Sequence, residues 1–378
     1  MKKKIYNFTN IPSHYRSLLW EKLLDSISFD FHFFFGKKNK LNIKEIDFKS
    51  KNFQKYKHKL HLIENYWFRN RILVWQKGVI KTCLTHNFDT AIFLGEVQIV
   101  SNWIAMLICR IRRIQVVYWT HGIYGNESFF KKKLRVLFYK TANKLLLYEK
   151  RAKKLLIQEG LEESNLKVIY NSLDYDIHKK LRLSNDVIKK KNLTFFKDSE
   201  RPYLIFVGRL TSTKRIDMLI KAVEKLNDMQ LKVNLLLIGD GAEKQNLENL
   251  TIELNIHDSV HFYGACYDES YLGYFIYHAS LCVSPGNVGL TAIHSLSFGT
   301  PVCTHSNLFN QMPEVEAIKE GMTGCYFEEN NLDNLIEVIK NWMNKKIKRE
   351  NIRKQCYKVV DDYYNPYYQS QIMISLLK

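Results

Sequence analysis

The sequence predicts an α/β protein with two doubly wound, Rossmann-like domains whose sheets are mainly parallel. Its 378 residues exceed what one ordinary core holds and suit two domains. Short apolar runs alternate with segments of helical periodicity along most of the chain, and these runs lack the polar alternation of half-exposed strands. This alternation is typical of parallel sheets covered by helices on both faces.

The second half of the chain shows this order most clearly. Apolar runs that mostly end at glycine or proline predict strands, and the segments between them predict helices. The expected strands are 202–208, 233–241, 259–265, 281–285 and 301–305, and the expected helices are 214–226, 243–255, 270–279, 289–299 and 332–344.

The first half alternates more loosely, and its first 60 or so residues show no clear order. Strands are expected at 90–96, 114–122 and 166–174, with helices at 102–113 and 128–142. A polar, charged segment then predicts a linker. The expected organisation is an N-terminal Rossmann-like domain at 1–182, a linker at 183–200, a C-terminal Rossmann-like domain at 201–358 and a C-terminal helix at 359–378 that packs back on the N-terminal domain.

The net charge of +19 is concentrated in the first half. Residues 1–200 contain 39 Lys and Arg against 18 Asp and Glu, whereas residues 201–378 contain 18 against 20. Genome-wide lysine enrichment would act on both halves, so the asymmetry predicts an anionic partner for the first domain. No recognition motif supports a nucleic acid as that partner.

The helix expected at 128–142 is amphipathic. Phe130, Leu134, Leu137 and Phe138 form an apolar stripe on a helical wheel. The basic residues opposite this stripe are expected to face an anionic membrane surface or a lipid-diphosphate acceptor; they are Lys131, Lys132 and Arg135.

Cysteine usage and hydropathy indicate which cellular compartment and which cofactors to expect. Seven cysteines occur without a C-x-x-C pair, so we expect neither disulfides nor a cysteine zinc site. No apolar run reaches 18 residues, and the start of the chain has no apolar stretch typical of a signal peptide. We therefore expect a cytoplasmic protein with no cofactor and no metal, and we do not interpret the D-x-D at 174–176 as a metal site.

Two loops of the second half are candidates for phosphate binding. Gly208, Arg209 and Lys214 follow a predicted strand, and Gly289, Leu290 and Thr291 open a predicted helix after a later strand. Strand carboxyl ends and helix N-termini are where open α/β sheets bind anions. Each loop alone is weak support, because solvated basic residues and glycine turns are common, but together they favour a diphosphate site.

The motifs "FVGRLTSTKRIDMLIKA", "LLLIGDGAEKQNLENL", "VSPGNVGLTAIHSLSFGTPV" and "EAIKEGMTGCYF" resemble the donor-binding half of retaining family-4 glycosyltransferases. The resemblance covers about residues 165–345. It implies the GT-B fold, two Rossmann-like domains facing across a cleft, and a nucleotide-sugar donor. It also implies that Arg209 and Lys214 hold the donor diphosphate and that Gly289 and Leu290 meet phosphate.

The chain departs from this family at its acidic pair. The family's E-x7-E signature falls on Gly286 and His294. In the resemblance, Gly286 and Asn287 stand where the donor sugar is contacted and His294 where the ribose is contacted, and Glu316 remains a family-like acid near the donor. A histidine packed in a buried helix is the alternative for His294.

One further histidine is singled out in the first domain. His121 comes just after the strand expected at 114–122, where the resemblance implies a histidine near the transferred sugar. We expect it to be the catalytic residue, through hydrogen bonds to the donor or shielding of developing charge; the alternative is a loop histidine without a role.

Together these features predict a hexosyltransferase that moves a sugar from a nucleotide donor to a lipid-linked or growing bacterial surface polysaccharide of the capsule or O-antigen type. Retention is implied by the resemblance, and the enzyme is expected at the inner face of the plasma membrane. The alternative is an inactive or epimerase-like GT-B protein that binds sugar nucleotides without transfer.

Overall fold

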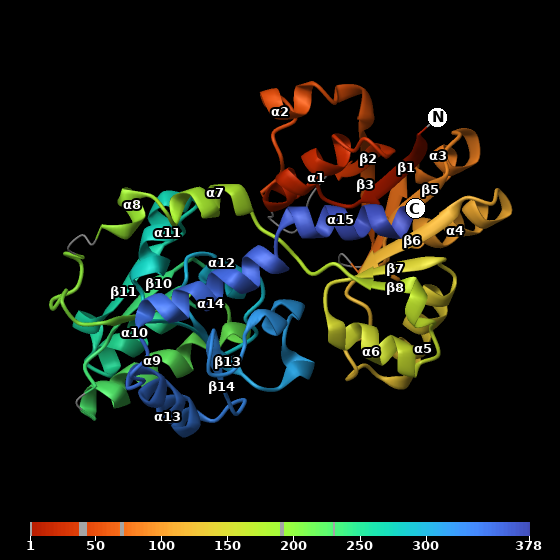
Figure 1. The fold of residues 1–378 in the computed structure, drawn as a ribbon. Coiled ribbons are helices and arrows are strands. Elements are labelled where there is room, and N and C mark those ends of the chain that lie inside the picture. Colours follow the sequence, from red (N-terminus) through yellow and green to blue (C-terminus); the bar gives the residue numbers. More distant parts are fainter. Residues whose placement is uncertain (1, 38–43, 69–71, 190–192, 230) are drawn as a thin grey trace. The chain divides into compact units, whose positions relative to one another are not determined.

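The computed structural model describes residues 2–37, 44–68, 72–189, 193–229 and 231–378. The chain divides into two compact units (Figure 1). The N-terminal unit comprises residues 1–174 and 365–378, and the C-terminal unit comprises residues 175–364. Each unit is an α/β fold around a largely parallel sheet, and this is the GT-B type of architecture that the sequence predicts.

The unit boundaries differ from those expected. The first boundary falls after Asp174 rather than residue 182, because α7 (Tyr175–Leu181) packs on α11 and α12 of the C-terminal unit. The expected linker at 183–200 contains α8 (Asn185–Ile188), which also packs on α11, while residues 190–192 lie outside the described residues. The last boundary falls at Asn365 rather than residue 359.

The sheet of the N-terminal unit has the strand order β4-β3-β2-β1-β5-β6-β7-β8. All neighbours are parallel except β3 and β4, which are antiparallel. The strands are β1 (Lys3–Thr9), β2 (Phe29–Lys37), β3 (Leu60–Phe68), β4 (Leu73–Lys77), β5 (Thr90–Leu94), β6 (Gln115–Thr120), β7 (Lys144–Leu147) and β8 (Leu166–Val168). Its helices are α1 (Ser17–Leu24), α2 (Lys51–Gln54), α3 (Val79–Thr85), α4 (Val100–Ile111), α5 (Phe129–Lys140), α6 (Lys150–Gln158) and α15 (Pro366–Leu377).

Two apolar cores cover the two faces of this sheet. On one face, α3, α4, α5 and α6 bury side chains against β5, β6 and β7. On the other face, α1 and α15 pack on aromatic side chains of β2. Phe31, Phe33 and Phe35 point to this second face and Phe34 to the first, so β2 is buried on both sides.

Helix α15 is part of the N-terminal unit. Asn365 caps its start by accepting a hydrogen bond from the Tyr368 N–H (2.9 Å), and Pro366 fits the first turn. The buried Gln369 side chain donates to the Tyr170 carbonyl (2.9 Å) and accepts from the Ser172 hydroxyl (2.5 Å). These bonds fix the helix against the segment that follows β8.

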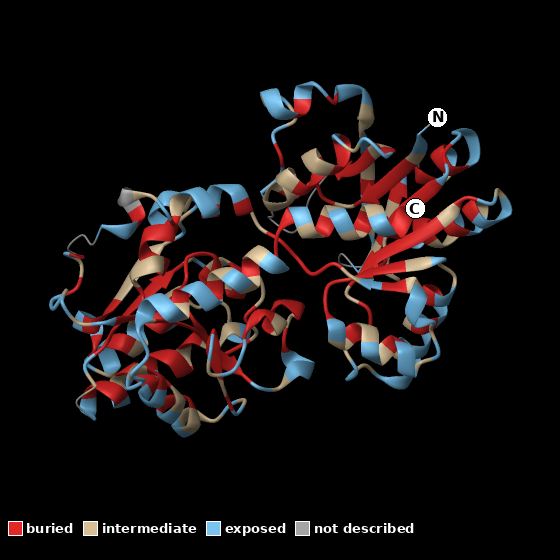
Figure 2. Cartoon of the chain, in the orientation of Figure 1, coloured by how far each residue is buried: buried red, intermediate tan, exposed pale blue. Residues whose placement is uncertain are grey.

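The sheet of the C-terminal unit is entirely parallel, with the order β11-β10-β9-β12-β13-β14. Its strands are β9 (Tyr203–Val207), β10 (Asn234–Ile238), β11 (Val260–Gly264), β12 (Leu281–Ser284), β13 (Val302–His305) and β14 (Gly324–Phe327). Its remaining helices are α9 (Ile216–Asp228), α10 (Lys244–Glu253), α11 (Glu269–His278), α12 (Thr291–Ser297), α13 (Leu332–Met343) and α14 (Arg349–Asp362). Figure 2 shows the strands as mostly buried.

The strand order determines where loops meet. β9 and β12 are neighbours in the middle of the sheet, although about 75 residues separate them in the chain. The loops after these two strands therefore lie at the same edge of the sheet, which is where open α/β folds place their ligands.

Candidate functional site

Two loops of the C-terminal unit contact each other at the carboxyl ends of β9 and β12. The Gly286 N–H donates to the Lys214 carbonyl (3.0 Å), and the Lys214 ammonium donates to the carbonyl and side-chain oxygens of Asn287 (both 2.6 Å). The Thr291 hydroxyl donates to the Val207 carbonyl (2.9 Å) beside Gly208. The structure thus brings together most of the residues that the sequence predicts for the donor.

Gly286 is required by close packing of these loops. A Cβ atom on Gly286 would lie 2.0 Å from the Thr213 carbonyl oxygen and 2.8 Å from the Lys214 Cα. The position that is acidic in the resembled family therefore has no room for a side chain here. The Asn287 side chain, expected to face the donor sugar in its place, holds the Lys214 ammonium.

The turn before α12 needs a left-handed residue, and Gly289 supplies it with φ of 58°. Leu290 is the N-cap of α12, and its carbonyl accepts a hydrogen bond from the His294 N–H (3.0 Å). The first amides of a helix have no partner within the helix. At seven residues α12 is short, so an anion at this edge also needs the cations of the neighbouring loop.

Lys214 and Arg209 provide those cations. Arg209 is exposed, whereas Lys214 is only partly exposed. Burial and the nearby charge of Arg209 lower the pKa of Lys214 to about 8, and the Glu314 carboxylate opposes this shift. Two close positive groups, one of them with a depressed pKa, are typical of a site built to receive an anion.

Glu314 is a residue that the sequence analysis missed. It is buried, and its charge acts on Lys214. The predicted acid, Glu316, lies in the same 3-10 segment (Pro313–Ala317), where its charge raises the pKa of Tyr326, an effect smaller than that of burial and of Glu320. The sequence does not distinguish Glu314 from Glu316, because only the packing of this turn decides which carboxylate acts on Lys214.

His294 belongs to a partly buried polar cluster, in which only His178 is fully buried. Its Nε2 atom lies 2.9 Å from Oε2 of Glu269, and Nε2 of His178 lies 3.0 Å from the same oxygen. Burial alone would raise the pKa of Glu269, but the two histidines, His294 first, hold it well below its usual range. An ionised carboxylate only accepts hydrogen bonds, so each imidazole donates to it from Nε2.

The same three side chains are spaced closely enough for a metal site. The ligand atoms of His178, Glu269 and His294 all lie within 4.8 Å of one another. The two imidazole rings are stacked, however, with centroids 4.8 Å apart and planes only 17° from parallel. A metal binds in the plane of each imidazole ring, and stacked planes do not meet at one ion. The arrangement therefore fits a shared hydrogen-bonded carboxylate.

In the N-terminal unit, His121 follows directly after β6. Its ring packs against Tyr148, with centroids 4.5 Å apart. Burial, helped by the charges of Arg16 and Arg135, lowers the pKa of His121 to about 4. The imidazole is therefore neutral near pH 7 and is a weak base. It can exchange hydrogen bonds with a substrate hydroxyl. A neutral ring has no charge of its own with which to shield a charge that develops on the substrate.

The loop 121–128 is held in place by α5. Arg135 donates to the Gly122 carbonyl (3.0 Å) and lies 3.5 Å from the Glu127 carboxylate. Glu127 in turn accepts hydrogen bonds from the N–H groups of Tyr124 (2.7 Å) and Gly125 (2.8 Å). Arg135 thus positions the loop that carries His121.

This arrangement removes Arg135 from the predicted membrane-facing set. Arg135 points into its own unit, and Lys132 pairs with Glu159 at 2.6 Å. Lys131 is exposed. The helix is rotated from the expected orientation, because Val136, Phe138 and Tyr139 are the side chains that fill the core. The predicted apolar stripe, Phe138 excepted, faces outward instead.

Glu96 is a second residue that sequence reasoning missed. It follows β5, the neighbour of β6, so it lies at the same strand edge as His121. Burial raises its pKa, although Arg135 and the Gln98 amide (3.1 Å) oppose the shift. An acidic residue at the end of a predicted strand was the available signal.

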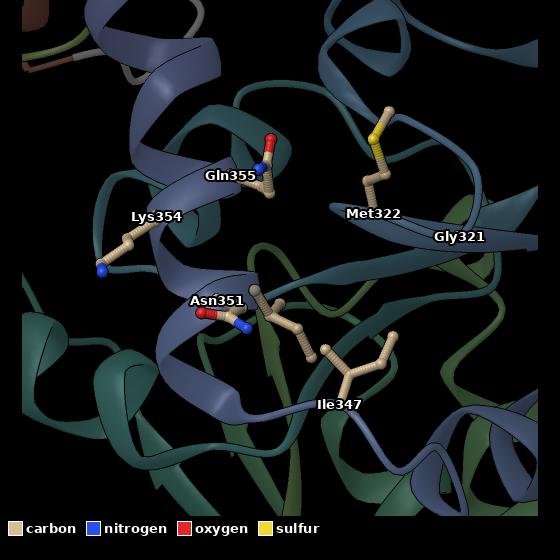
Figure 3. Close-up of a pocket in the computed structure, with 7 residues that line it drawn as sticks. Gly321, Met322, Ile347, Asn351, Lys354 and Gln355 are labelled. Carbon is tan, nitrogen blue, oxygen red and sulfur yellow. The ribbon is translucent and has the colours of Figure 1, made fainter.

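The C-terminal unit also has a pocket of about 270 Å³ away from the predicted donor residues (Figure 3). Its lining includes Met322 and Ile347, and Lys354 points away from Met322. None of the predicted site residues lines this pocket. It lacks the loop contacts that make the β9–β12 edge a candidate site.

Residues 188–359 match the family model of glycosyl transferases, group 1, somewhat less than half of the chain. A glycosyltransferase of Haemophilus influenzae, described as uncharacterized, is 27% identical over 252 residues, 66% of this chain and 65% of that protein. The O-antigen biosynthesis glycosyltransferase WclY of Escherichia coli is 30% identical over 162 residues, 40% of this chain and 42% of that protein. The matched regions thus cover less than two thirds of these relatives.

Solved structures share the fold. The crystal structure of Anabaena HepE in complex with UDP has a TM-score of 0.70 at 16% identity, covering 100% of this chain and 99% of that chain. The chain therefore has the GT-B fold of known glycosyltransferases in both units. None of the helices in the described part of the chain has the length and apolar character needed to cross a bilayer.

Proposed function

We propose that the protein is a glycosyltransferase that uses a nucleotide-sugar donor. The observation that carries this proposal is the pair of loops at the carboxyl ends of β9 and β12, where Arg209 and the lowered-pKa Lys214 adjoin the start of α12. A diphosphate would neutralise both cations and accept hydrogen bonds from the helix amides. The match to group 1 glycosyl transferases covers this region.

Each chemical group of the donor would contact its own set of residues. Arg209, Lys214 and the 289–291 turn would hold the diphosphate, and the ribose would lie toward His294 and Glu269. His121 would form a hydrogen bond with a hydroxyl of the transferred sugar. Retention is part of this proposal because the resembled family is retaining, and a neutral His121 suits a hydrogen bond to the sugar. Neither a metal nor another cofactor is part of this proposal.

The acceptor we propose is a lipid-linked or growing surface polysaccharide of the capsule or O-antigen type. The relative named for O-antigen biosynthesis supports this choice. The excess of basic residues in the first half of the chain supports an anionic partner. The corresponding location is the inner face of the plasma membrane, with the protein bound peripherally.

A sugar-nucleotide binder without transferase activity is the second candidate. The loss of both family glutamates, at Gly286 and His294, favours it. Its distinguishing property is simple: such a protein would bind the donor but release no free nucleotide when an acceptor is supplied.

A thermal-shift screen of UDP-, GDP- and TDP-sugars tests the proposal first. A ligand at 100 times its Kd adds ~2.7 kcal/mol to the free energy of unfolding, which raises Tm by several degrees. The donor identified in this way is then incubated with membrane extracts, and released nucleotide is measured. Failure of every nucleotide sugar to raise Tm contradicts the proposal.

A further inference from the structure

Helices α4 and α5 expose large apolar side chains. On α4 these residues recur every three or four positions, and on α5 they begin at the first turn. Ile111 and Phe130 are each 83% exposed, and Phe129 and Leu137 are about 60% exposed. The full set, here called the α4–α5 surface, is Val100, Ile104, Leu107, Ile111, Phe129, Phe130, Leu134 and Leu137.

The two helices present this surface on one side of the sheet. Both bury their opposite sides in the same core, and the rings of Trp103 and Phe138 are 4.5 Å apart between them. The Arg110 guanidinium of α4 also donates to the Thr141 carbonyl at the end of α5 (3.4 Å). Exposed apolar side chains gathered on neighbouring helices mark an interaction surface rather than scattered surface residues.

The charged residues within the two helices are all basic. Neither α4 nor α5 contains an acidic residue. Lys131 and Lys133 are exposed within α5. Glu159, just after α6, pairs mainly with Lys132 (2.6 Å, against 3.9 Å for Lys133). At the ends of the helices, a pocket of about 310 Å³ is lined by Arg110, Arg113, Ile114, Gln115 and Asn143.

We propose that the α4–α5 surface docks on a bilayer that contains anionic phospholipid. The apolar side chains would enter the boundary between headgroups and acyl chains, and the lysines would lie among the phosphates. The pocket at Arg110 and Arg113 would receive one headgroup phosphate. A second copy of the chain is a poor occupant, because it would bring the same lysines face to face.

This docking also gives His121 a place relative to the lipid, a point that rests on the proposed function. The loop 121–128 leads directly into Phe129 and Phe130. Insertion of these two side chains would hold the loop of His121 close to the headgroup layer. A lipid-linked acceptor presents its sugar in that layer.

Vesicle flotation of the full chain tests the proposal. The vesicles are phosphatidylcholine alone or phosphatidylcholine with 30% phosphatidylglycerol, at about 0.1 M salt. We expect binding only to the anionic vesicles. The triple variant Phe130→Ser/Leu134→Ser/Leu137→Ser should lose it, whereas the control Met229→Ser/Ile252→Ser/Met322→Ser, at exposed apolar residues of the C-terminal unit, should bind like the wild type.

A charge variant and two separate measurements complete the test. Lys131→Gln/Lys133→Gln should weaken partitioning about 30-fold, since each lysine near an anionic surface is worth ~1 kcal/mol. Wild-type protein that ignores anionic vesicles, or a triple variant that binds them fully, overturns the proposal. So does a dimer, seen by ultracentrifugation, that the triple variant abolishes. Donor binding measured by calorimetry without vesicles tests the proposed function separately.

Discussion

Nε2 of His294 lies 2.9 Å from Oε2 of Glu269, and the carboxylate comes from a different helix. The chain thus keeps a carboxylate next to a position that is acidic in the resembled family, but it supplies that group from α11. His178 binds the same oxygen at 3.0 Å. The ribose side of the proposed site therefore depends on a three-residue cluster rather than on His294 alone.

Glu269→Gln should lower the free energy of unfolding by ~1–3 kcal/mol at pH 7, because two hydrogen bonds to a charged group are weakened. The folded pKa of Glu269 lies below its unfolded value of about 4.5, so its contribution is complete above that pH and is lost as pH falls. Urea denaturation from pH 7 to 3 should show the difference between wild type and variant shrinking below about pH 4.5. A constant difference would contradict the assignment. Glu253→Gln, on the preceding helix α10, is the control.

Donor binding should weaken at alkaline pH because of Lys214. Its pKa of about 8 in the free protein is below the ordinary 10.5, and a bound diphosphate favours the protonated form. Affinity should therefore fall between pH 7.5 and 9, approaching tenfold per pH unit above the pKa. Lys214→Arg, which stays charged, should flatten this dependence in calorimetric titrations.

The two cations should also matter at neutral pH. Arg209→Ala and Lys214→Ala should each weaken donor binding by ~1.5–3 kcal/mol, the range for charge-assisted hydrogen bonds. Lys221→Ala, at an exposed lysine of α9, should leave the affinity within twofold. Unchanged affinity in both site variants would remove the diphosphate from this edge of the sheet.

His121→Ala should reduce release of nucleotide from the donor by at least tenfold while nucleotide affinity stays within twofold.

His121 should also affect how stability depends on pH. Its folded pKa of about 4 lies below the unfolded 6.5, so the unfolded chain binds the extra proton between these values and stability rises with pH there. His121→Gln should therefore lose less stability than wild type between pH 6.5 and 4, by up to ~1.4 kcal/mol per pH unit. Equal acid sensitivity in both proteins would place His121 in a more solvated site.

Gly286→Ala should destabilise the C-terminal unit by ~2 kcal/mol or more, because the new Cβ meets the Thr213 carbonyl at 2.0 Å. Gly286→Glu should be at least as damaging and should not improve donor turnover. Thermal melts of both variants, beside Ser280→Ala at the partly buried residue that precedes β12, provide the measurement. A fully stable Gly286→Glu with higher turnover would show that the loop can move aside for the acid.

Sequence reasoning located much of this site because its signals are local. A parallel strand, a glycine turn and a helix start follow one another in the chain, so the positions of Arg209, Lys214 and Gly289 could be read directly. The strands of the first 60 residues were missed, since β2 is a run of aromatic residues buried on both sides and has no period to recognise. Their order depends on pairing with β1 and β3, which is nonlocal.

The sequence by itself determined the alternating α/β pattern, the fold type and the loops that gather the cations, because periodicity and turn chemistry are properties of neighbouring residues. Only the tertiary structure decided that Glu269 meets His294, that Glu314 acts on Lys214 and that Gly286 is closed to a side chain. It also decided that α5 turns Phe130 outward and Arg135 inward. Each of these depends on how one element packs on another, and packing is set by contacts between residues far apart in the chain.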